Sequence, residues 1–316
     1  MVPDKAWTIW VVSPVRAGSR ILQPPSKKFL RVAGGLALAV FLLLQTASFA
    51  AEAGSASALR ARYDGMRASL AHNQFGRPLS LDSSETESGL NGDIYGVVNF
   101  PFASVTAALK EVPHWCDILI LHLNIKYCSP APGQTLAIYV GSKKPQALAT
   151  AFRMDYIYRS LADTPDYLQQ AMSASKGPLG TKNYRMMLEA MPLDGGKTFL
   201  HVRYAYSQGM MARLATSSYL NTIGHDKVGF TPEKNAGGKM YVSGLRGAVE
   251  RNTMRYYLAI EAYLGALGSP PREQLDKRFH DWFEYTERYG MQLHEISLNE
   301  YLDMKHEEYY RQQKQP

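Results

Sequence analysis

The sequence contains few cysteines and lacks the motifs that hold metal ions or activate nucleophiles. Its two cysteines, Cys116 and Cys128, form no C-x-x-C pair, so neither a redox motif nor a zinc site is indicated. The eight histidines form no H-x-x-E-H or H-x-x-x-H set. Residues 243–247 have the spacing of neither a P-loop nor a nucleophile turn. We therefore expect no metal and no other cofactor.

The excess positive charge lies mostly in the first 50 residues. The chain has 35 Lys and Arg against 28 Asp and Glu, a formal net charge of +7. Residues 1–50 hold six of those basic residues and one acid, so the other 266 residues carry 29 basic and 27 acidic side chains, a net charge of +2. Because basic and acidic side chains are nearly equal in number after residue 50, the charge gives no support for nucleic-acid binding, and we expect no nucleic-acid partner.

Residues 1–50 are predicted to be a secretory signal peptide. Basic residues at positions 27, 28 and 31 precede an uncharged, largely aliphatic run over residues 32–51, and residues 48–50 resemble an A-x-A cleavage site. The alternative is an uncleaved anchor in the inner membrane, because about 20 apolar residues just span a bilayer. We therefore expect a periplasmic or secreted protein, with anchoring by residues 32–51 as the alternative.

Export would place the two cysteines in an oxidising compartment. In an oxidising compartment, an even pair this close in sequence indicates a disulfide between Cys116 and Cys128. Such a bridge would stabilise the fold by roughly 2–4 kcal/mol. The alternative is a pair of buried free thiols.

The rest of the chain predicts a run of antiparallel strands closed by one long helix. Residues 51–91 are expected to form a helix around residues 59–70 and then a polar linker. Alternation of apolar and polar residues, or position in the chain, predicts strands at residues 94–100, 121–128, 136–140, 152–159, 167–175, 184–190 and 199–206. Helical spacing predicts a long amphipathic helix over residues 249–267 and a helical tail over residues 269–316.

This order resembles the helix-grip fold of the START-like (SRPBCC) superfamily. The resemblance covers residues 92–268. It rests on residues 95–98 entering Pro101-Phe102, on Val105 and Leu109 before Trp115, on Gly177-Pro178 before residues 184–189, on the hairpin partner at residues 199–206, and on the closing helix. It implies an α+β fold: a curved antiparallel sheet gripped by a long C-terminal helix, here with an extra C-terminal helical appendage.

The resemblance also implies an apolar cavity between sheet and helix that holds a hydrophobic small molecule or lipid. The inward-facing candidates for ligand binding are Tyr156, Tyr158, Met186, Tyr204, Tyr206, Tyr257, Ile260 and Leu264. The alternative is that these side chains fill a solid core.

A charged cluster lies near the start of the long helix. It consists of Arg246, Glu250, Arg251 and Arg255. These residues either guide an anionic headgroup to the mouth of a cavity or form salt bridges with the acidic tail, near Glu284, Glu287 or Glu295.

Three classes of function remain open. The pattern favours an exported binding protein, with possible contact with a membrane surface and an oligomeric state that the sequence does not predict. The second class is an enzyme resembling the polyketide cyclases and dehydratases of the same fold, for which His122, Glu189, His201 and Arg203 are the candidates. On the predicted alternation, Glu189, His201 and Arg203 point away from the inner face, which counts against them. The third class is a solid-core envelope interaction protein that works through its tail.

Overall fold

The computed structural model describes residues 54–87, 89–209, 227–235 and 238–314. The predicted signal peptide at residues 1–50 and its alternative, an anchor at residues 32–51, lie outside the described residues. Within the described ranges, no helix is both long enough and apolar enough to cross a membrane.

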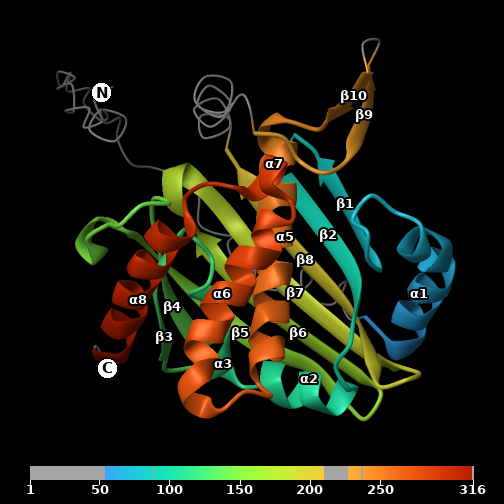
Figure 1. Ribbon diagram of the computed structural model, residues 1–316, viewed down its shortest axis with the longest axis horizontal. Helices are drawn as coiled ribbons and strands as arrows, with labels where there is room; N and C mark the ends of the chain where they lie inside the picture. The colour runs from blue at the N-terminus through green and yellow to red at the C-terminus, as the bar shows by residue number, and fades with distance from the viewer. Residues whose placement is uncertain (1–53, 88, 210–226, 236–237, 315–316) are drawn as a thin grey trace, which may run out of the picture. The chain divides into compact units, whose positions relative to one another are not determined.

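The central element is an antiparallel sheet of eight strands in the order β1-β2-β8-β7-β6-β5-β4-β3 (Figure 1). Its strands are β1 (Leu79–Glu85), β2 (Gly89–Val98), β3 (Ile125–Ala131), β4 (Thr135–Val140), β5 (Phe152–Thr164), β6 (Tyr167–Lys176), β7 (Thr181–Leu193) and β8 (Lys197–Gln208). Strands β3 to β8 follow one another as neighbours, and β2 then pairs with β8. A separate hairpin consists of β9 (Pro232–Asn235) and β10 (Gly238–Tyr241).

One face of the sheet is covered by the long helix α5 (Gly244–Ala266), with α6 beside it (Figure 1). The other helices are α1 (Ala56–Ala71), α2 (Phe102–Leu109), α3 (Val112–Leu119), α6 (Gln274–Glu287), α7 (Gly290–Leu293) and α8 (Leu298–Lys314). The chain therefore has the expected α+β architecture, a curved antiparallel sheet gripped by a long helix and followed by a helical appendage.

The main core lies between α5 and the inner face of the sheet. Tyr257, Ile260 and Leu264 of α5 are all buried there, at 0%, 1% and 3% exposure. Gly96 of β2 permits the close approach of the helix, because a Cβ at this position would lie 2.2 Å from the hydroxyl oxygen of Tyr257.

The outer face of the sheet has a smaller core beneath α1. Leu59 and Leu70 of the helix pack with Tyr95, Tyr167 and Phe199 of the sheet. The predicted helix around residues 59–70 is thus confirmed. Both faces of the sheet are covered in this region, which explains why its outward positions are partly apolar.

Three predicted elements differ from the structure. The polar linker expected to end the segment at residues 51–91 is absent from residues 81–85 and 89–91, which instead belong to the edge strand β1, where Leu79 and Ser83 are buried, and to the start of β2, where buried and partly buried residues alternate. The strand expected from residue 121 begins only at Ile125, because Leu121 and His122 form a turn in which their amides bond to the carbonyls of Ile118 and Leu119. Helix α5 begins at residue 244, five residues before the predicted start.

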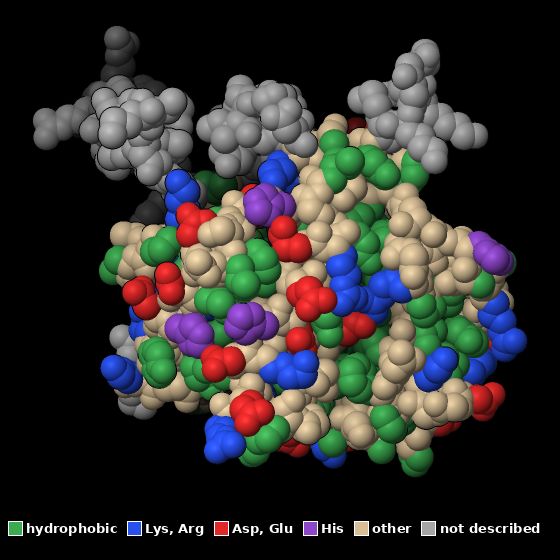
Figure 2. Space-filling view, in the orientation of Figure 1, with side chains coloured by type: hydrophobic (Ala, Val, Ile, Leu, Met, Phe, Trp, Pro, Cys, Tyr) green, Lys and Arg blue, Asp and Glu red, His purple; other side chains and the backbone are tan. Residues whose placement is uncertain are grey.

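The C-terminal appendage closes the side of the fold near β3. Helix α6 packs against α5 and α8, and α8 packs against β3. Ser297 and Glu300 form a capping box: the Ser297 amide donates to Glu300 Oε2 at 2.9 Å, and the Glu300 amide donates to Ser297 Oγ at 3.4 Å. Figure 2 shows acidic and basic side chains interspersed over the visible face of the molecule.

Cys116 of α3 and Cys128 of β3 form a disulfide bond, with their Cα atoms 5.1 Å apart. The predicted bridge is therefore confirmed. It joins α3 to the sheet across the turn that contains His122.

Candidate functional site

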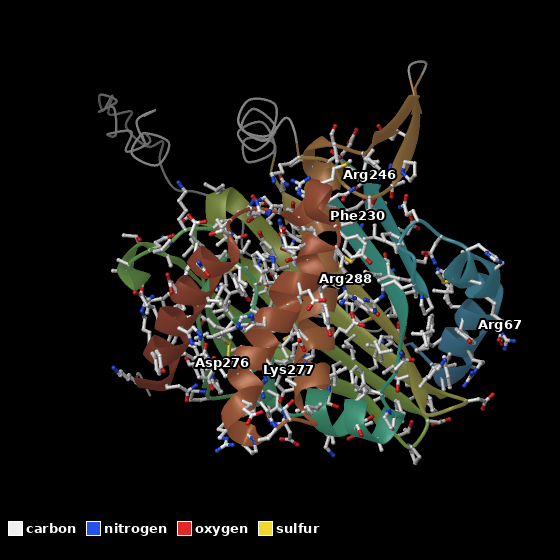
Figure 3. The ribbon with its side chains drawn as sticks, in the orientation of Figure 1. Arg67, Phe230, Arg246, Asp276, Lys277 and Arg288 are labelled. Carbon is white, nitrogen blue, oxygen red and sulfur yellow. A yellow bond between two sulfur atoms is a disulfide. The ribbon has the colours of Figure 1, made fainter. Side chains whose placement is uncertain are left out.

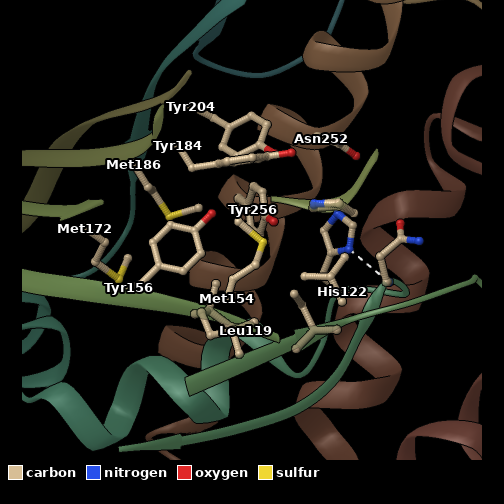
Figure 4. Close-up of a pocket in the computed structure, with 15 residues that line it drawn as sticks. Leu119, His122, Met154, Tyr156, Met172, Tyr184, Met186, Tyr204, Asn252 and Tyr256 are labelled. Carbon is tan, nitrogen blue, oxygen red and sulfur yellow. Dashed lines mark hydrogen bonds between the residues drawn. The ribbon is translucent and has the colours of Figure 1, made fainter. Parts of the chain in front are cut away.

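A cavity of about 150 Å³ lies between the inner face of the sheet and α5 (Figure 4). Its aromatic and sulfur-containing walls are Met154, Tyr156, Met172, Tyr184, Met186, Tyr204 and Tyr256, and its polar lining residues are His122, Asn124 and Asn252. The methionines come from β5, β6 and β7, where alternation turns them inward. Methionine side chains are flexible, so this wall can adapt to the shape of an occupant.

Three tyrosine hydroxyls of the cavity wall are free to bind a ligand. Those of Tyr156, Tyr204 and Tyr256 have no hydrogen-bond partner among the described residues, whereas the Tyr184 hydroxyl lies 2.7 Å from Thr181 Oγ1. Burial raises the pKa of all four phenols, so each keeps its proton at neutral pH. Each free hydroxyl can therefore donate or accept one hydrogen bond inside the cavity.

His122 has one ring nitrogen bonded and one free. Its Nδ1 accepts a hydrogen bond from the backbone amide of Asn124 at 3.1 Å, so in the neutral ring the proton is on Nε2. The side chain is only 2% exposed, and its Nε2 has no partner in the part of the chain that the structure describes. Burial, and then the positive charges of Arg255, Lys305 and Lys143, hold the pKa of His122 well below its usual value, against a smaller opposing effect of the Asn252 side chain. His122 therefore presents an N–H donor that, among the described residues, lies beside Asn252 but forms no hydrogen bond of normal geometry.

Four basic side chains gather around a single carboxylate near this end of the cavity, and we call them the basic cluster. Lys143 Nζ and Arg255 Nη2 lie 2.5 and 2.8 Å from Glu295 Oε1, and Lys227 Nζ lies 3.7 Å from Oε2. The fourth member, Arg251, donates to the carbonyls of residues 227 and 228. Burial would raise the pKa of Glu295, but Arg255 and Lys143 hold it below its usual value, so the carboxylate is ionised.

Mutual repulsion and burial also act on the basic groups themselves. Burial and then Arg255 lower the pKa of Lys143 to about 8 and that of Arg251 to about 10. The charge of Glu250 also acts on Arg251, so four cations face two carboxylates and leave an excess of positive charge at this point. The pair Arg255–Glu295 is one of the salt bridges to the tail that the sequence led us to consider.

Among the described residues, Arg246 and Glu250 form no salt bridge with the tail, unlike Arg255, and instead bind β1 and the segment at residues 230–231. Arg246 lies in the first turn of α5 (Figure 3), and its Nε donates to Ser83 Oγ at 2.8 Å. Glu250 Oε2 accepts from the amides of Phe230 and Thr231 at 2.5 and 2.9 Å. These two residues fix the segment before the β9–β10 hairpin to α5 and β1.

The comparisons with known proteins yielded solved structures alone. No family model and no curated protein matches the sequence. The solved structures similar to this chain include a conserved protein from Geobacillus kaustophilus, with 16% identity over 44% of this chain and 85% of that chain, TM-score 0.29. They also include the human StarD13 lipid transfer and protein localization domain, with 9% identity over 50% and 88%, TM-score 0.26. A third is the truncated norcoclaurine synthase of Thalictrum flavum, with 10% identity over 45% and 91%, TM-score 0.30. Similarities this weak establish neither membership of a family nor a ligand.

Three of the eight residues proposed for ligand binding line the cavity, namely Tyr156, Met186 and Tyr204. The other five are elsewhere in the core. Tyr158 donates from its hydroxyl to the carbonyl of Lys110 at 3.0 Å, and the ring of Tyr206 stacks on Tyr184 at 5.2 Å. Tyr257, Ile260 and Leu264 pack beneath the sheet.

Several lining residues were missing from the proposed set. Met154 and Tyr184 have the same inward phase as Tyr156 and Met186, so alternation marks them equally well. His122 entered only as a candidate for the enzyme alternative, because the apparent strand at residues 121–128 gave no sign of the turn that directs its ring to the cavity.

The other enzyme candidates lie on the outer face of the sheet. His201 donates from both ring nitrogens to carboxylates, 2.7 Å from Glu189 Oε2 and 2.7 Å from Asp93 Oδ1, and Arg203 Nε donates to the same Asp93 oxygen at 2.7 Å. Burial would lower the pKa of His201, but the two carboxylates raise it above its usual value. Tyr95 stacks on its ring at 4.2 Å. This network is on the opposite side of the sheet from the cavity, so it takes no part in that site.

Proposed function

We propose that this protein binds a small hydrophobic molecule in the cavity between the sheet and α5. The observation that carries the proposal is the cavity itself, whose wall combines flexible methionines with three phenol hydroxyls that have no hydrogen-bond partner within the described ranges. A dry core leaves such hydroxyls unsatisfied at a cost, whereas an occupant can bond to them. The presence of this cavity favours a binding function over a solid-core interaction protein.

The size of the cavity limits the occupant. An apolar cavity of about 150 Å³ is known to take up a molecule the size of benzene. The expected ligand is therefore a single ring or a short chain. A lipid with long acyl chains needs the methionine wall to move.

No specific observation supports the enzyme alternative. The described residues that line the cavity include one imidazole and four phenols but no carboxylate. Acid–base catalysis by a paired His and carboxylate therefore has no candidate pair here. We favour binding over catalysis for this reason.

The proposal includes export of the protein after removal of residues 1–50. The disulfide between Cys116 and Cys128 supports this, because such bonds persist mainly in oxidising compartments. A binding protein also has a use there, since apolar compounds are poorly soluble in the aqueous periplasm.

Methionine methyl groups offer a direct test of binding. In protein labelled with ¹³C at the methionine methyls, 2-phenylethanol should shift the signals of Met154, Met172 and Met186, which line the cavity. The signal of Met291, which is 67% exposed, should not move. Shifts spread evenly over exposed and buried methionines would count against a single site.

A matched pair of variants gives the control. Met186→Trp fills the cavity with an indole and should abolish the shifts at Met154 and Met172. Met291→Trp makes the same change on the surface and should leave binding intact. If Met186→Trp binds 2-phenylethanol as well as the wild type does, the ligand lies elsewhere and the proposal fails.

A further inference from the structure

The Nε2–H donor of His122 is buried in the cavity wall and has no hydrogen-bond partner in the described part of the chain. A buried N–H with no partner costs free energy, and native proteins rarely leave one. Asn124 fixes the tautomer by donating to Nδ1, so this N–H cannot become an acceptor without giving up that bond. Figure 4 shows His122 and Asn252 at one end of the cavity, with Met172 at the other. A ligand that satisfies His122 must therefore place a hydrogen-bond acceptor at the His122 end.

The surrounding charges decide which acceptor fits best. Arg255, Lys305 and Lys143 are all near enough to lower the pKa of His122, and Arg255 also has a buried Nε without a partner among the described residues. The basic cluster holds four cations against the carboxylate of Glu295 and, beside Arg251, that of Glu250. Among the described residues, no acidic side chain lines the cavity. A negatively charged acceptor is favoured by this field, while a cation is opposed by it.

We propose that the ligand is a small hydrophobic acid, whose anionic group accepts a hydrogen bond from Nε2 of His122 in the field of the basic cluster. Its hydrocarbon part lies among Met154, Met172 and Met186. This inference rests on the proposed function and narrows it, because it names the chemical class of the molecule and the end of the cavity that each part occupies. Hydrogen bonds to charged groups are stronger than those between neutral ones, so the acid group should contribute much of the affinity.

Phenylacetate and 2-phenylethanol form a suitable pair of probes. They share one carbon skeleton, close to the size of the cavity, and differ in the acid group. Isothermal titration calorimetry at neutral pH should show phenylacetate binding about tenfold or more tightly than 2-phenylethanol, as expected for one hydrogen bond to a charged group.

Variants then locate the acid group. His122→Phe keeps a ring for stacking on Tyr256 but removes the donor, and it should abolish the preference for phenylacetate. Lys143→Met removes one charge of the basic cluster from a partly exposed position and should weaken phenylacetate binding several-fold while leaving 2-phenylethanol unchanged. Lys144→Met removes the same charge from the exposed neighbouring residue and should change neither.

The outcomes separate the two proposals. Equal binding of both probes, or tighter binding of the alcohol, overturns the acid inference but leaves the binding cavity standing. A preference for phenylacetate that survives both His122→Phe and Lys143→Met also overturns it, because the acid group then lies elsewhere. Binding of neither probe overturns the proposed function as well. If His122→Phe fails to fold, the comparison of Lys143→Met with Lys144→Met decides.

Discussion

Replacing Glu308 by glutamine leaves two buried ammonium groups without a counter-charge. Lys126 Nζ lies 2.9 Å from Glu308 Oε1, and Lys305 Nζ lies 2.7 Å from Oε2. The three side chains are 0%, 2% and 0% exposed in the order Lys126, Glu308 and Lys305. This triad fixes α8 to β3, and Lys305 also donates to the carbonyl of His122 at 2.8 Å. The triad therefore supports the turn that holds His122 at the cavity.

Removing one member of a buried ion pair typically costs about 3–5 kcal/mol, because the remaining charge is left uncompensated. We expect Glu308→Gln to lower the free energy of unfolding by this amount. For a domain of this size, the midpoint of thermal unfolding should fall by about 6–20 °C. An unpaired ammonium can also lose its proton, so the loss should shrink as the pH rises toward 10.

The assay is urea unfolding followed by circular dichroism at pH 7. Glu307→Gln is the matched control, since Glu307 is exposed and its replacement should change stability by no more than about 0.5 kcal/mol. The reasoning is refuted if Glu308→Gln costs less than about 1 kcal/mol or cannot be distinguished from Glu307→Gln.

Three further predictions follow from burial, charge and the N-terminal pattern. Burial lowers the pKa of Lys305 to about 8, so the folded state binds fewer protons than the unfolded state between about pH 8 and 10.5. The free energy of unfolding should therefore rise with pH in this window, by up to roughly 3 kcal/mol relative to Lys305→Met. A difference between the two proteins that does not change with pH in urea unfolding would contradict this. Leu264→Ala should lower the free energy of unfolding by about 2–5 kcal/mol, whereas Leu267→Ala, at a 37% exposed position, should change it by no more than about 0.5 kcal/mol. Equal effects of the two substitutions would show that the buried face of α5 is misassigned. N-terminal sequencing of protein from the producing cell should begin within a few residues of position 51, and an intact N-terminus would instead support an anchored form.

The sheet and the long helix were predictable because the spacing of their apolar residues along the sequence matches the spacing of their buried positions. Leu200, Val202 and Tyr204 are buried in the main core, as the alternation in β8 indicates, while Phe199 and His201 lie on the other face. The edge strand β1 was missed because most of its residues are polar. An edge strand with one solvated face needs few apolar residues, so its sequence resembles that of a linker.

The cavity could be predicted only in part. Alternation assigns Tyr156, Tyr158 and Met186 to one face, but it does not say which of them meet a neighbour and which border a space. That depends on the distance between α5 and each strand, which varies along the helix. Tyr257 meets the backbone at Gly96, whereas Tyr256, one residue earlier, borders the cavity.

The position of His122 was hidden for a different reason. Leu121, Leu123 and Ile125 alternate as in a strand, yet hydrogen bonds to the end of α3 hold residues 121 and 122 in a turn. Long-range contacts from Lys305 and the disulfide then fix this turn against the sheet. Such contacts join segments far apart in the chain, so no local pattern reports them.

The central claim is that a small hydrophobic molecule occupies the space between the sheet and α5. A crystal structure of the protein grown with phenylacetate tests it most directly. The account predicts density for the ring among Met154, Met172 and Met186, with the carboxylate within hydrogen-bonding distance of His122 Nε2. A cavity that holds only water, or phenylacetate bound elsewhere on the protein, would contradict it.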